Sequence, residues 1–470
     1  MPRYEYSEGT SNKFWEIELS GTSYTSKWGK IGGSTSMSTK SYGDAAAAKK
    51  ELDKLVAEKL KKGYTLVGGA AKKQAGKPAK PVKPVKPAGP ARNAELEKAI
   101  RANPEDPDAY LVYADWMQAN GEIRGELAVL QHAGKTKEAK AMLRKYADWF
   151  LGDFAKKAKA LPSDLELEWY CGFIKKATIG WPSFEHGMDY DDETAGEQLD
   201  EDESWYERCQ RLVGEFLKLP SAQFIQELEL GPMPGDEECS LGCFARAIDE
   251  VKPVTLRKLT IANTGEWDIS STSTAMPDSK SIKNLRELRI GGGTPSIGKI
   301  DLPELRSFSV ETGGLGKKAL AEIAAAKWPK LERLEIWTGD PSYGSTCTAK
   351  QLAPIFAATG LKHLKHLMLK NCAFADAAVK LLVNSKLLRQ LETLDLSMGN
   401  LSDKGVAMML KDRAQFAHLT LLCLDDSALD ETTDKMVKGL AKKVTMLGQT
   451  PERAVPRGEN SWGRYTAVGE

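Results

Sequence analysis

The stretch LKHLMLKNCAF, residues 364–374, sets leucines at positions 364, 367 and 369 and follows them with Cys372 and Phe374. The same order, Leu-x-x-Leu-x-Leu, returns at Leu391 and at Leu419. Side chains alternate between the two faces of a strand, so the second and third leucines of each set point to one face. The pattern therefore predicts a short strand at each position with one apolar face.

Related sets begin further upstream, and the helix-like stretch AFADAAVKLLVNSKLL, residues 373–388, lies between two of the sets. The eight starts lie 31, 29, 20, 26, 33, 27 and 28 residues apart, at Ile225, Leu256, Leu285, Leu305, Leu331, Leu364, Leu391 and Leu419. This spacing and this alternation resemble the strand-plus-helix class of leucine-rich repeats. The resemblance covers about half the chain and implies a repeat solenoid over residues 161–470 with a C-terminal cap.

A repeat solenoid usually binds its partners on the concave surface. Residues that flank the second and third leucines are expected there, because neighbouring strand side chains alternate faces. The set comprises Lys258, Arg289, Arg333, Glu335, Trp337, His366, Met368, Lys370, Asp395 and Asp425. Aromatic residues and arginine are enriched in binding hot spots. We predict a protein partner held by Arg289, Arg333, Glu335, Trp337, His366 and Lys370; the alternative is a polar surface without a partner.

The charge of the chain is divided unevenly along its length. The net charge of the 470 residues is +1, but residues 1–92 carry 18 Lys or Arg against 8 Asp or Glu. The length suggests several domains. A basic front end on an acidic body favours a polyanion-binding N-terminal part.

Residues 1–67 read as four strands followed by one helix. The strands are expected at 3–6, 13–19, 23–31 and 34–42, where aromatic, β-branched and polar residues alternate. Asp44 offers a helix N-cap, and an apolar stripe follows at Ala45, Ala48, Leu52, Leu55, Val56 and Leu60. The pattern predicts a small sheet with this helix packed on one face.

The segments NKFWEIEL at 12–19, SKWGKIGG at 26–33 and KLKKGY at 59–64 resemble the WGR domain, known from some poly(ADP-ribose) polymerases. That family implies nucleic-acid binding, often at DNA ends or 5′-phosphates, with the tryptophan and the basic residue of its triplet near the nucleic acid. Here these residues are Trp28 and Lys30. The family usually has arginine where this chain has Lys30, and lysine keeps the charge but lacks the planar, bidentate fork.

The residue types agree with this resemblance. An indole stacks on bases without sequence preference, Gly29 permits close approach of a strand, and Lys30 and Lys27 attract phosphate. We predict a DNA site made of Trp28, Gly29, Lys30, Lys27, Lys49 and Lys50. In the alternative interpretation Trp28 packs in the sheet and Gly29 only makes a turn.

Two further segments join these parts. Residues 68–92 repeat Lys-Pro, which predicts a flexible, solvated linker whose seven positive charges could also follow a phosphate backbone. Residues 93–160 are expected to be helical and resemble a repeat-companion module of bacterial multidomain proteins, on Tyr113-Ala114-Asp115-Trp116 and Arg124-Gly125-Glu126. That module has no settled activity and often precedes leucine-rich repeats. The fold class expected is multidomain α/β.

The sequence offers little for catalysis. It contains no P-loop, GxSxG or HExxH motif, and its seven cysteines form no CxxC pair. No stretch approaches the roughly 20 apolar residues of a membrane span, and the polar first residues do not resemble a secretory signal. We therefore expect a cytoplasmic, non-enzymatic adaptor without cofactor or metal. The alternatives are a pure protein-interaction scaffold and an enzyme with an unfamiliar site.

Two other features have ordinary explanations. The stretch 185–207 holds 11 carboxylates and no Lys or Arg, which suits a solvated loop or a site for cations or a basic partner. A second Trp-Gly-Arg triplet, at 462–464, has no matching strands around it and is expected to close the repeat array.

Overall fold

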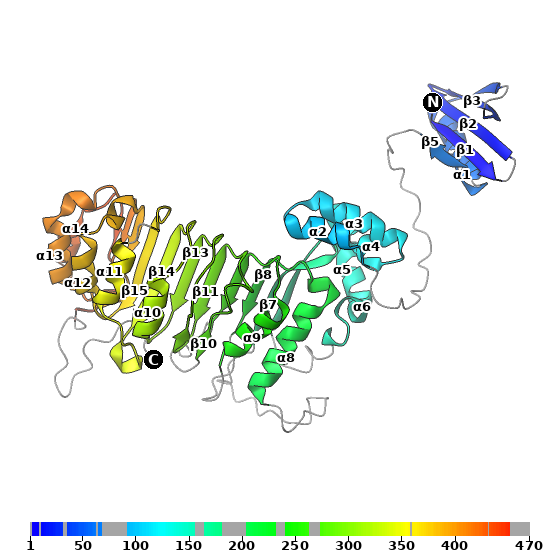
Figure 1. Ribbon diagram of the computed structural model, residues 1–470. Coiled ribbons are helices and arrows are strands. Elements are labelled where there is room, and N and C mark those ends of the chain that lie inside the picture. The colour runs from blue at the N-terminus through cyan, green and yellow to red at the C-terminus, as the bar shows by residue number, and fades with distance from the viewer. Residues whose placement is uncertain are drawn as a thin grey trace. The chain divides into compact units, whose positions relative to one another are not determined.

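The computed structural model divides the chain into two compact units, Met1–Pro84 and Val85–Glu470 (Figure 1). It describes residues 2–8, 11–31, 35–62, 64–67, 92–155, 164–180, 204–231, 240–262, 273–357, 360–430 and 432–451. Three predicted segments lie outside these residues. They are the linker except for Arg92, the acidic stretch up to residue 203, and the triplet at 462–464.

The first unit is an antiparallel sheet of five strands in the order β4-β3-β2-β1-β5. The strands are β1 (Arg3–Glu8), β2 (Ser11–Ser20), β3 (Ser23–Lys30), β4 (Thr35–Ser41) and β5 (Thr65–Val67). Helix α1 (Ala45–Lys61) begins at the predicted cap, where Asp44 Oδ1 accepts the Ala47 N–H at 2.7 Å. The predicted helix and all four predicted strands are present, and β5 is a strand that the sequence pattern did not predict.

The core of this unit lies between one face of the sheet and α1. Tyr4, Trp15, Ile17 and Tyr24 are its buried strand residues. Leu52, Leu55 and Val56 of the predicted apolar stripe pack against them. The helix therefore covers the sheet face to which Trp15 and Tyr24 point.

The second unit begins with helices that pack onto its sheet. They are α2 (Ala94–Ala102), α3 (Pro107–Ala119), α4 (Ile123–His132), α5 (Thr136–Lys145) and α6 (Ala147–Leu151). Tyr110 and Tyr113 of α3 contact the rings of Phe173 and Phe224 with centroids 5.8–6.4 Å apart. Because of this shared aromatic core, the helical segment and the segment after 161, which we expected as two domains, lie in one compact unit.

An eleven-stranded sheet forms the body of this unit (Figure 1). Only the pair β6–β7 is antiparallel, and from β7 to β18 each strand runs parallel to the next in the sheet. The strands are β6 (Asp164–Tyr170), β7 (Phe173–Gly180), β8 (Glu227–Leu230), β9 (Lys258–Ile261), β11 (Glu287–Gly291), β13 (Ser307–Glu311), β14 (Arg333–Gly339), β15 (His366–Cys372), β16 (Thr393–Asp395), β17 (Leu421–Cys423) and β18 (Val444–Thr445). Strands β10 (Thr274–Ala275) and β12 (Pro295–Ser296) pair separately.

The apolar positions that the sequence pattern predicted lie in register across neighbouring strands. One row consists of the second position of each set, Leu228, Leu259, Leu288, Phe308, Leu334, Leu367, Leu394 and Leu422. Every member of this row is at most 2% exposed. The spacing of the sequence sets thus becomes a continuous apolar face in the sheet.

Helices cover that apolar face (Figure 1). They are α8 (Trp205–Lys218), α9 (Gly242–Val251), α10 (Lys317–Ala324), α11 (Ala349–Ala357), α12 (Ala375–Leu382), α13 (Asp403–Lys411) and α14 (Thr433–Val437). Short 3₁₀ turns lie at Pro220–Ala222, Pro341–Tyr343, Leu387–Gln390 and Arg413–Gln415. The opposite face carries the polar strand residues.

The row of buried side chains predicts a large cost for truncating one of them. Leu334→Ala should lower the free energy of unfolding of this unit by about 2–5 kcal/mol, because it removes buried methyl groups and leaves a cavity. Urea unfolding followed by circular dichroism measures this change. Val254→Ala is the control, since Val254 is 45% exposed and should change stability by less than about 0.5 kcal/mol. Equal effects of the two substitutions would contradict the packing described.

Candidate nucleic-acid interface

Trp28 lies at the uncovered part of the helix-bearing sheet face. It is paired with Trp15 across β2 and β3, and residues directly opposite each other in an antiparallel pair point to the same face. Trp15 is 4% exposed within the core, whereas Trp28 is 41% exposed. The indole of Trp28 therefore shares the core side of the sheet but is open to solvent.

Two lysines lie beside this indole. The next strand position on the same face pairs Lys13 with Lys30, and both side chains are exposed. Within the described part of this unit, neither lysine forms an ion pair with a carboxylate. Like charges directly opposite on a sheet are unfavourable. Binding an anion between them would relieve this repulsion.

A third lysine comes from the last turns of α1. The Lys59 Nζ lies 5.4 Å from the ring centroid of Trp15 and 4.9 Å from that of Tyr64. Burial first, and then the charges of Lys62 and Lys13, lower the pKa of Lys59 below the usual lysine value. Lys13 is thus close enough to disfavour the charge of Lys59.

Aromatic side chains extend the same surface. Tyr64 stacks on Tyr6 with ring centroids 5.3 Å apart, and Tyr6 is paired with Lys13 across β1 and β2. We call the set Tyr6, Lys13, Trp28, Lys30, Lys59 and Tyr64 the aromatic–lysine patch. It combines ammonium groups, which attract phosphates, with an open indole, on which a base or sugar can stack.

Lys27 and Gly29 lie on the other face of β3. Gly29 is paired with Phe14, and Lys27 with Glu16. Arg3 covers this face: its guanidinium lies 4.4 Å from the Phe14 ring centroid and its NH1 lies 3.2 Å from Glu16 Oε1. Because strand side chains alternate, the Trp28-Gly29-Lys30 triplet and Lys27 cannot act together from one face.

Lys49 and Lys50 also lie apart from the patch. They occupy the first turns of α1, about 15 Å along the helix axis from Lys59 at 1.5 Å per residue. Lys49 Nζ is bound to Asp53 Oδ2 at 3.0 Å. Of the six residues predicted for the DNA site, only Trp28 and Lys30 meet in the patch.

The patch includes residues that the sequence interpretation did not select. Lys13 occurs in NKFWEIEL, and Lys59 and Tyr64 occur in KLKKGY, segments that carry the family resemblance. Strand pairing brings Lys13 beside Lys30, and the packing of α1 brings Lys59 beside Trp15. Neither proximity follows from spacing along the chain.

The partner-binding residues predicted for the second unit do share one face of the large sheet. Arg289 and Glu335 align through Ser309, Arg333 is paired with His366, and Trp337 is paired with Lys370. All of them alternate with the buried apolar rows. The structure therefore brings the predicted set together, and its use as a binding site stays a prediction.

Several polar side chains on this face form hydrogen bonds and ion pairs with one another. Trp337, only 9% exposed, donates its Nε1–H to Glu335 Oε1 at 2.9 Å, and Lys370 Nζ lies 5.2 Å from its ring. Arg333 binds Glu335 Oε2 at 2.5 Å. Trp337 thus does not project as a free aromatic anchor, since it packs below Lys370.

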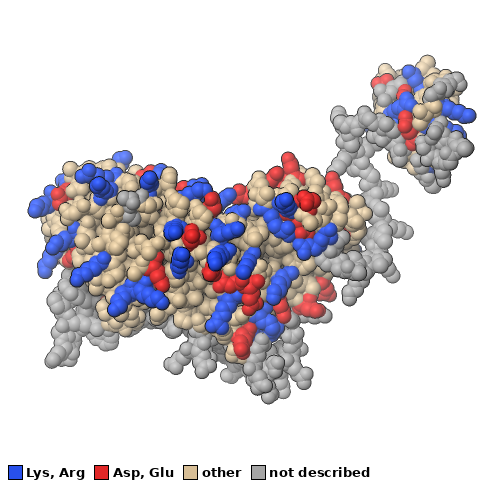
Figure 2. Space-filling view, viewed as in Figure 1, with Lys and Arg blue, Asp and Glu red and all other residues tan. Residues whose placement is uncertain are grey.

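Arg289 is held in the same way. Its Nε and NH2 donate to the two carboxylate oxygens of Glu311 at 2.8 and 2.6 Å. Burial alone would raise the pKa of Glu311, but the hydrogen bonds and charge of Arg289 lower it below the usual value. Figure 2 shows positive and negative side chains interspersed over the visible face of this unit. That surface therefore differs from the lysines around Trp28, where neither Lys13 nor Lys30 forms an ion pair among the described side chains.

Comparison with known proteins identifies the first unit. The model of the WGR domain matches residues 3–70. This part of the chain is a WGR domain. Escherichia coli Protein YehF is 44% identical over 64 residues, 14% of this chain and 23% of the relative. The uncharacterized protein YfeS of the same organism is 40% identical over 62 residues, which are 13% of this chain and 25% of that relative. The matches thus span about a quarter of these relatives and concern the WGR domain.

Two solved structures match larger parts of this chain at lower sequence identity. A crystal structure of a Bacteroides fragilis protein has 20% identity and a TM-score of 0.45, covering 96% of this chain and 97% of that one. An internalin from Listeria monocytogenes has 14% identity and a TM-score of 0.22, covering 51% of this chain and 89% of the internalin chain. Among the described residues, no helix is long and apolar enough to cross a membrane, and no cluster of His, Cys, Asp or Glu could hold a metal ion.

The repulsion within the WGR domain predicts how Lys59 responds to substitution. Lys13→Ala should raise the pKa of Lys59, because one of the positive charges that lower it is removed. Carbon-13 NMR of methylated lysines over a pH titration measures this pKa, and the signal missing in Lys59→Arg assigns it. Lys50→Ala removes an exposed lysine from the first turns of α1 and serves as control. An unchanged Lys59 pKa in Lys13→Ala would show that the two ammonium groups are not neighbours.

Proposed function

We propose that the WGR domain binds DNA through the aromatic–lysine patch. The observation that carries this proposal is the 41% exposed indole of Trp28, which shares its sheet face with Lys13 and Lys30 and with Trp15, the neighbour over which Lys59 lies. The family is associated with nucleic-acid binding in general, which agrees with this surface. Neither stacking on a base nor attraction to phosphate depends on the nucleotide sequence. The domain would therefore contact the phosphate backbone and the flat face of a base without distinguishing one base from another.

The arrangement of Lys30 favours a general phosphate contact. A lysine ammonium is a compact point charge, and it lacks the planar fork by which arginine grips a phosphate at two oxygens. Lys13 and Lys59 supply the additional charges at fixed positions on the same surface. The proposal is therefore a continuous contact with a DNA backbone, with Trp28 stacked on an unpaired or terminal nucleotide.

We infer further that the second unit is a leucine-rich repeat body that holds a protein, so that the whole chain is an adaptor. The eight in-register apolar positions and the helices packed on them support a repeat body. A tether between two binding parts raises the effective concentration of one ligand near the other. We place this adaptor in the cytoplasm and assign it no enzymatic activity.

A pure protein scaffold is the competing function. The part-buried salt bridges that Arg289 forms with Glu311 and Arg333 forms with Glu335 fix side chains on one face of the second unit, which suits protein recognition without nucleic acid. The two functions differ in salt dependence. Displacement of counterions from DNA makes its binding fall steeply as salt rises.

The DNA proposal predicts the effect of a double substitution. Trp28→Ala with Lys30→Ala should weaken binding of a fluorescent duplex with a single-stranded end about tenfold or more, since a stacked base contributes about 1–3 kcal/mol and a phosphate contact is also lost. Fluorescence anisotropy with the full chain at several salt concentrations measures this affinity.

The matched control is Met37→Ala with Lys40→Ala. It removes one exposed apolar side chain and one lysine from β4, with Met37 on the other face of the sheet. Binding should remain as in the unsubstituted chain. Equal losses in the two double variants, or no binding at low salt, would refute the proposed interface and favour the scaffold.

A further inference from the structure

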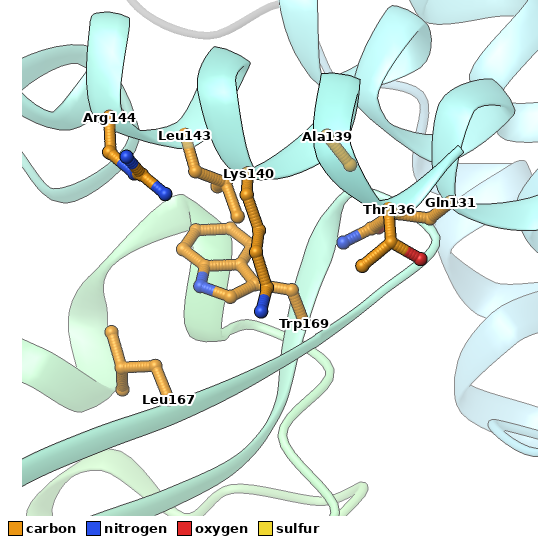
Figure 3. A pocket seen from close by; sticks show the side chains of 8 residues that line it. All are labelled: Gln131, Thr136, Ala139, Lys140, Leu143, Arg144, Leu167 and Trp169. Carbon is orange, nitrogen blue, oxygen red and sulfur yellow. The ribbon is translucent and has the colours of Figure 1, made fainter. Parts of the chain in front are cut away.

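A cavity of about 470 Å³ lies between helix α5 and the edge strand β6 of the second unit (Figure 3). Among the described strands, β6 is the last of the large sheet and is paired with β7 alone. Pockets for small molecules typically measure roughly 300–1,000 Å³. This cavity is therefore large enough for one compact ligand.

The wall on the strand side is apolar. Trp169 and Leu167 project from β6 on the same face, two residues apart, and Leu143 faces them from α5 (Figure 3). The indole of Trp169 is half-buried and is fixed by an edge-to-face contact with Phe150, with centroids 5.4 Å apart. This indole lines the cavity, and an aromatic ring there suits stacking with a planar ring.

The wall on the helix side is cationic. Lys140 and Arg144 are one helical turn apart and extend toward the space beside the Trp169 indole (Figure 3). None of the eight described lining residues is acidic, and neither cation forms an ion pair within the described part of the chain. Like charges four residues apart on a helix repel each other. An anion bound between them would stabilise this turn.

Gln131 completes a set of donors. Its Oε1 accepts the Gly172 N–H at 2.8 Å, which orients the amide and leaves Nε2 facing the cavity (Figure 3). Nε2 carries two hydrogens and can only donate. The polar groups that face this site are thus Gln131 Nε2 and the two cations, so they match a ligand rich in acceptors, while the Thr136 hydroxyl donates to the Gly134 carbonyl.

We propose that this cavity binds a nucleoside phosphate. The base stacks on Trp169, an acceptor on its edge receives a hydrogen bond from Gln131 Nε2, and the phosphates lie between Lys140 and Arg144. The chemistry at the site requires both parts of the ligand: the indole selects a planar ring, and the paired cations select an anion. This site is separate from the WGR domain and does not depend on its binding DNA.

Isothermal titration calorimetry of the full chain with adenosine diphosphate tests the proposal. Adenosine supplies the ring without charge, and pyrophosphate supplies the charge without a ring. We expect binding of adenosine diphosphate at about tenfold higher affinity than either fragment, because stacking and charge-assisted hydrogen bonds act together. Pyrophosphate binding as tightly as the nucleotide would contradict the role of Trp169.

Variants locate the binding. Lys140→Ala with Arg144→Ala should reduce the affinity for adenosine diphosphate about tenfold or more, since two charged partners of the phosphates are lost. Both side chains are exposed, so folding is retained. Lys135→Ala with Lys137→Ala makes the same charge change near the start of α5, outside the cavity lining, and should bind normally. Absence of binding, or equal binding by both double variants, would overturn the proposal.

Discussion

The pairing register between β2 and β3 determines the chemistry of the WGR domain. It sets Trp15 opposite Trp28 and Lys13 opposite Lys30, and residues opposite each other share a face. Trp15 is covered by α1, so the same register commits Trp28 and Lys30 to the core side of the sheet beyond the reach of the helix. A slip of one residue would put Lys27 and Gly29 there instead. The position of the indole in solvent follows from this register.

The burial of Lys59 is a consequence of the same arrangement. Its ammonium lies over the rings of Trp15 and Tyr64, and the nearby charge of Lys13 contributes to the lowered pKa of Lys59. The domain thus holds Lys13 and Lys62 at close range to Lys59, where their positive charges are unfavourable for that of Lys59. On the proposed function, a bound polyanion would remove this cost and so favour phosphate at this surface over scattered surface lysines.

The sequence predicted the body of the second unit in considerable detail. Leucine spacing alone located eight strands, because the period of two within a strand and the repeat between strands are both local properties. The shared face of Arg289, Arg333 and Trp337 followed from the same alternation. The pairing of Arg289 with Glu311 was beyond the sequence, since it joins neighbouring strands, whereas Glu335 meets Trp337 two residues along the same strand. The burial of Trp337 is decided by these contacts.

The residues of the candidate DNA site could be predicted only in part from the sequence pattern. Alternation within β3 already separates Lys27 from Trp28, so grouping them followed the motif and neglected the period of two. Lys13 and Lys59 required knowledge of the strand register and of the helix packing. Lys49 is held by Asp53, four residues later on the same helix, a pairing that the spacing does suggest.

NMR mapping of side chains tests the central claim most directly. Indole and lysine ammonium signals of the full chain would be followed as duplex DNA with a single-stranded end is added. Our account predicts shifts for Trp28, Lys13, Lys30 and Lys59, and none for Lys27 or Lys49. Shifts confined to Lys27 and Lys49, with the Trp28 indole unchanged, would contradict it.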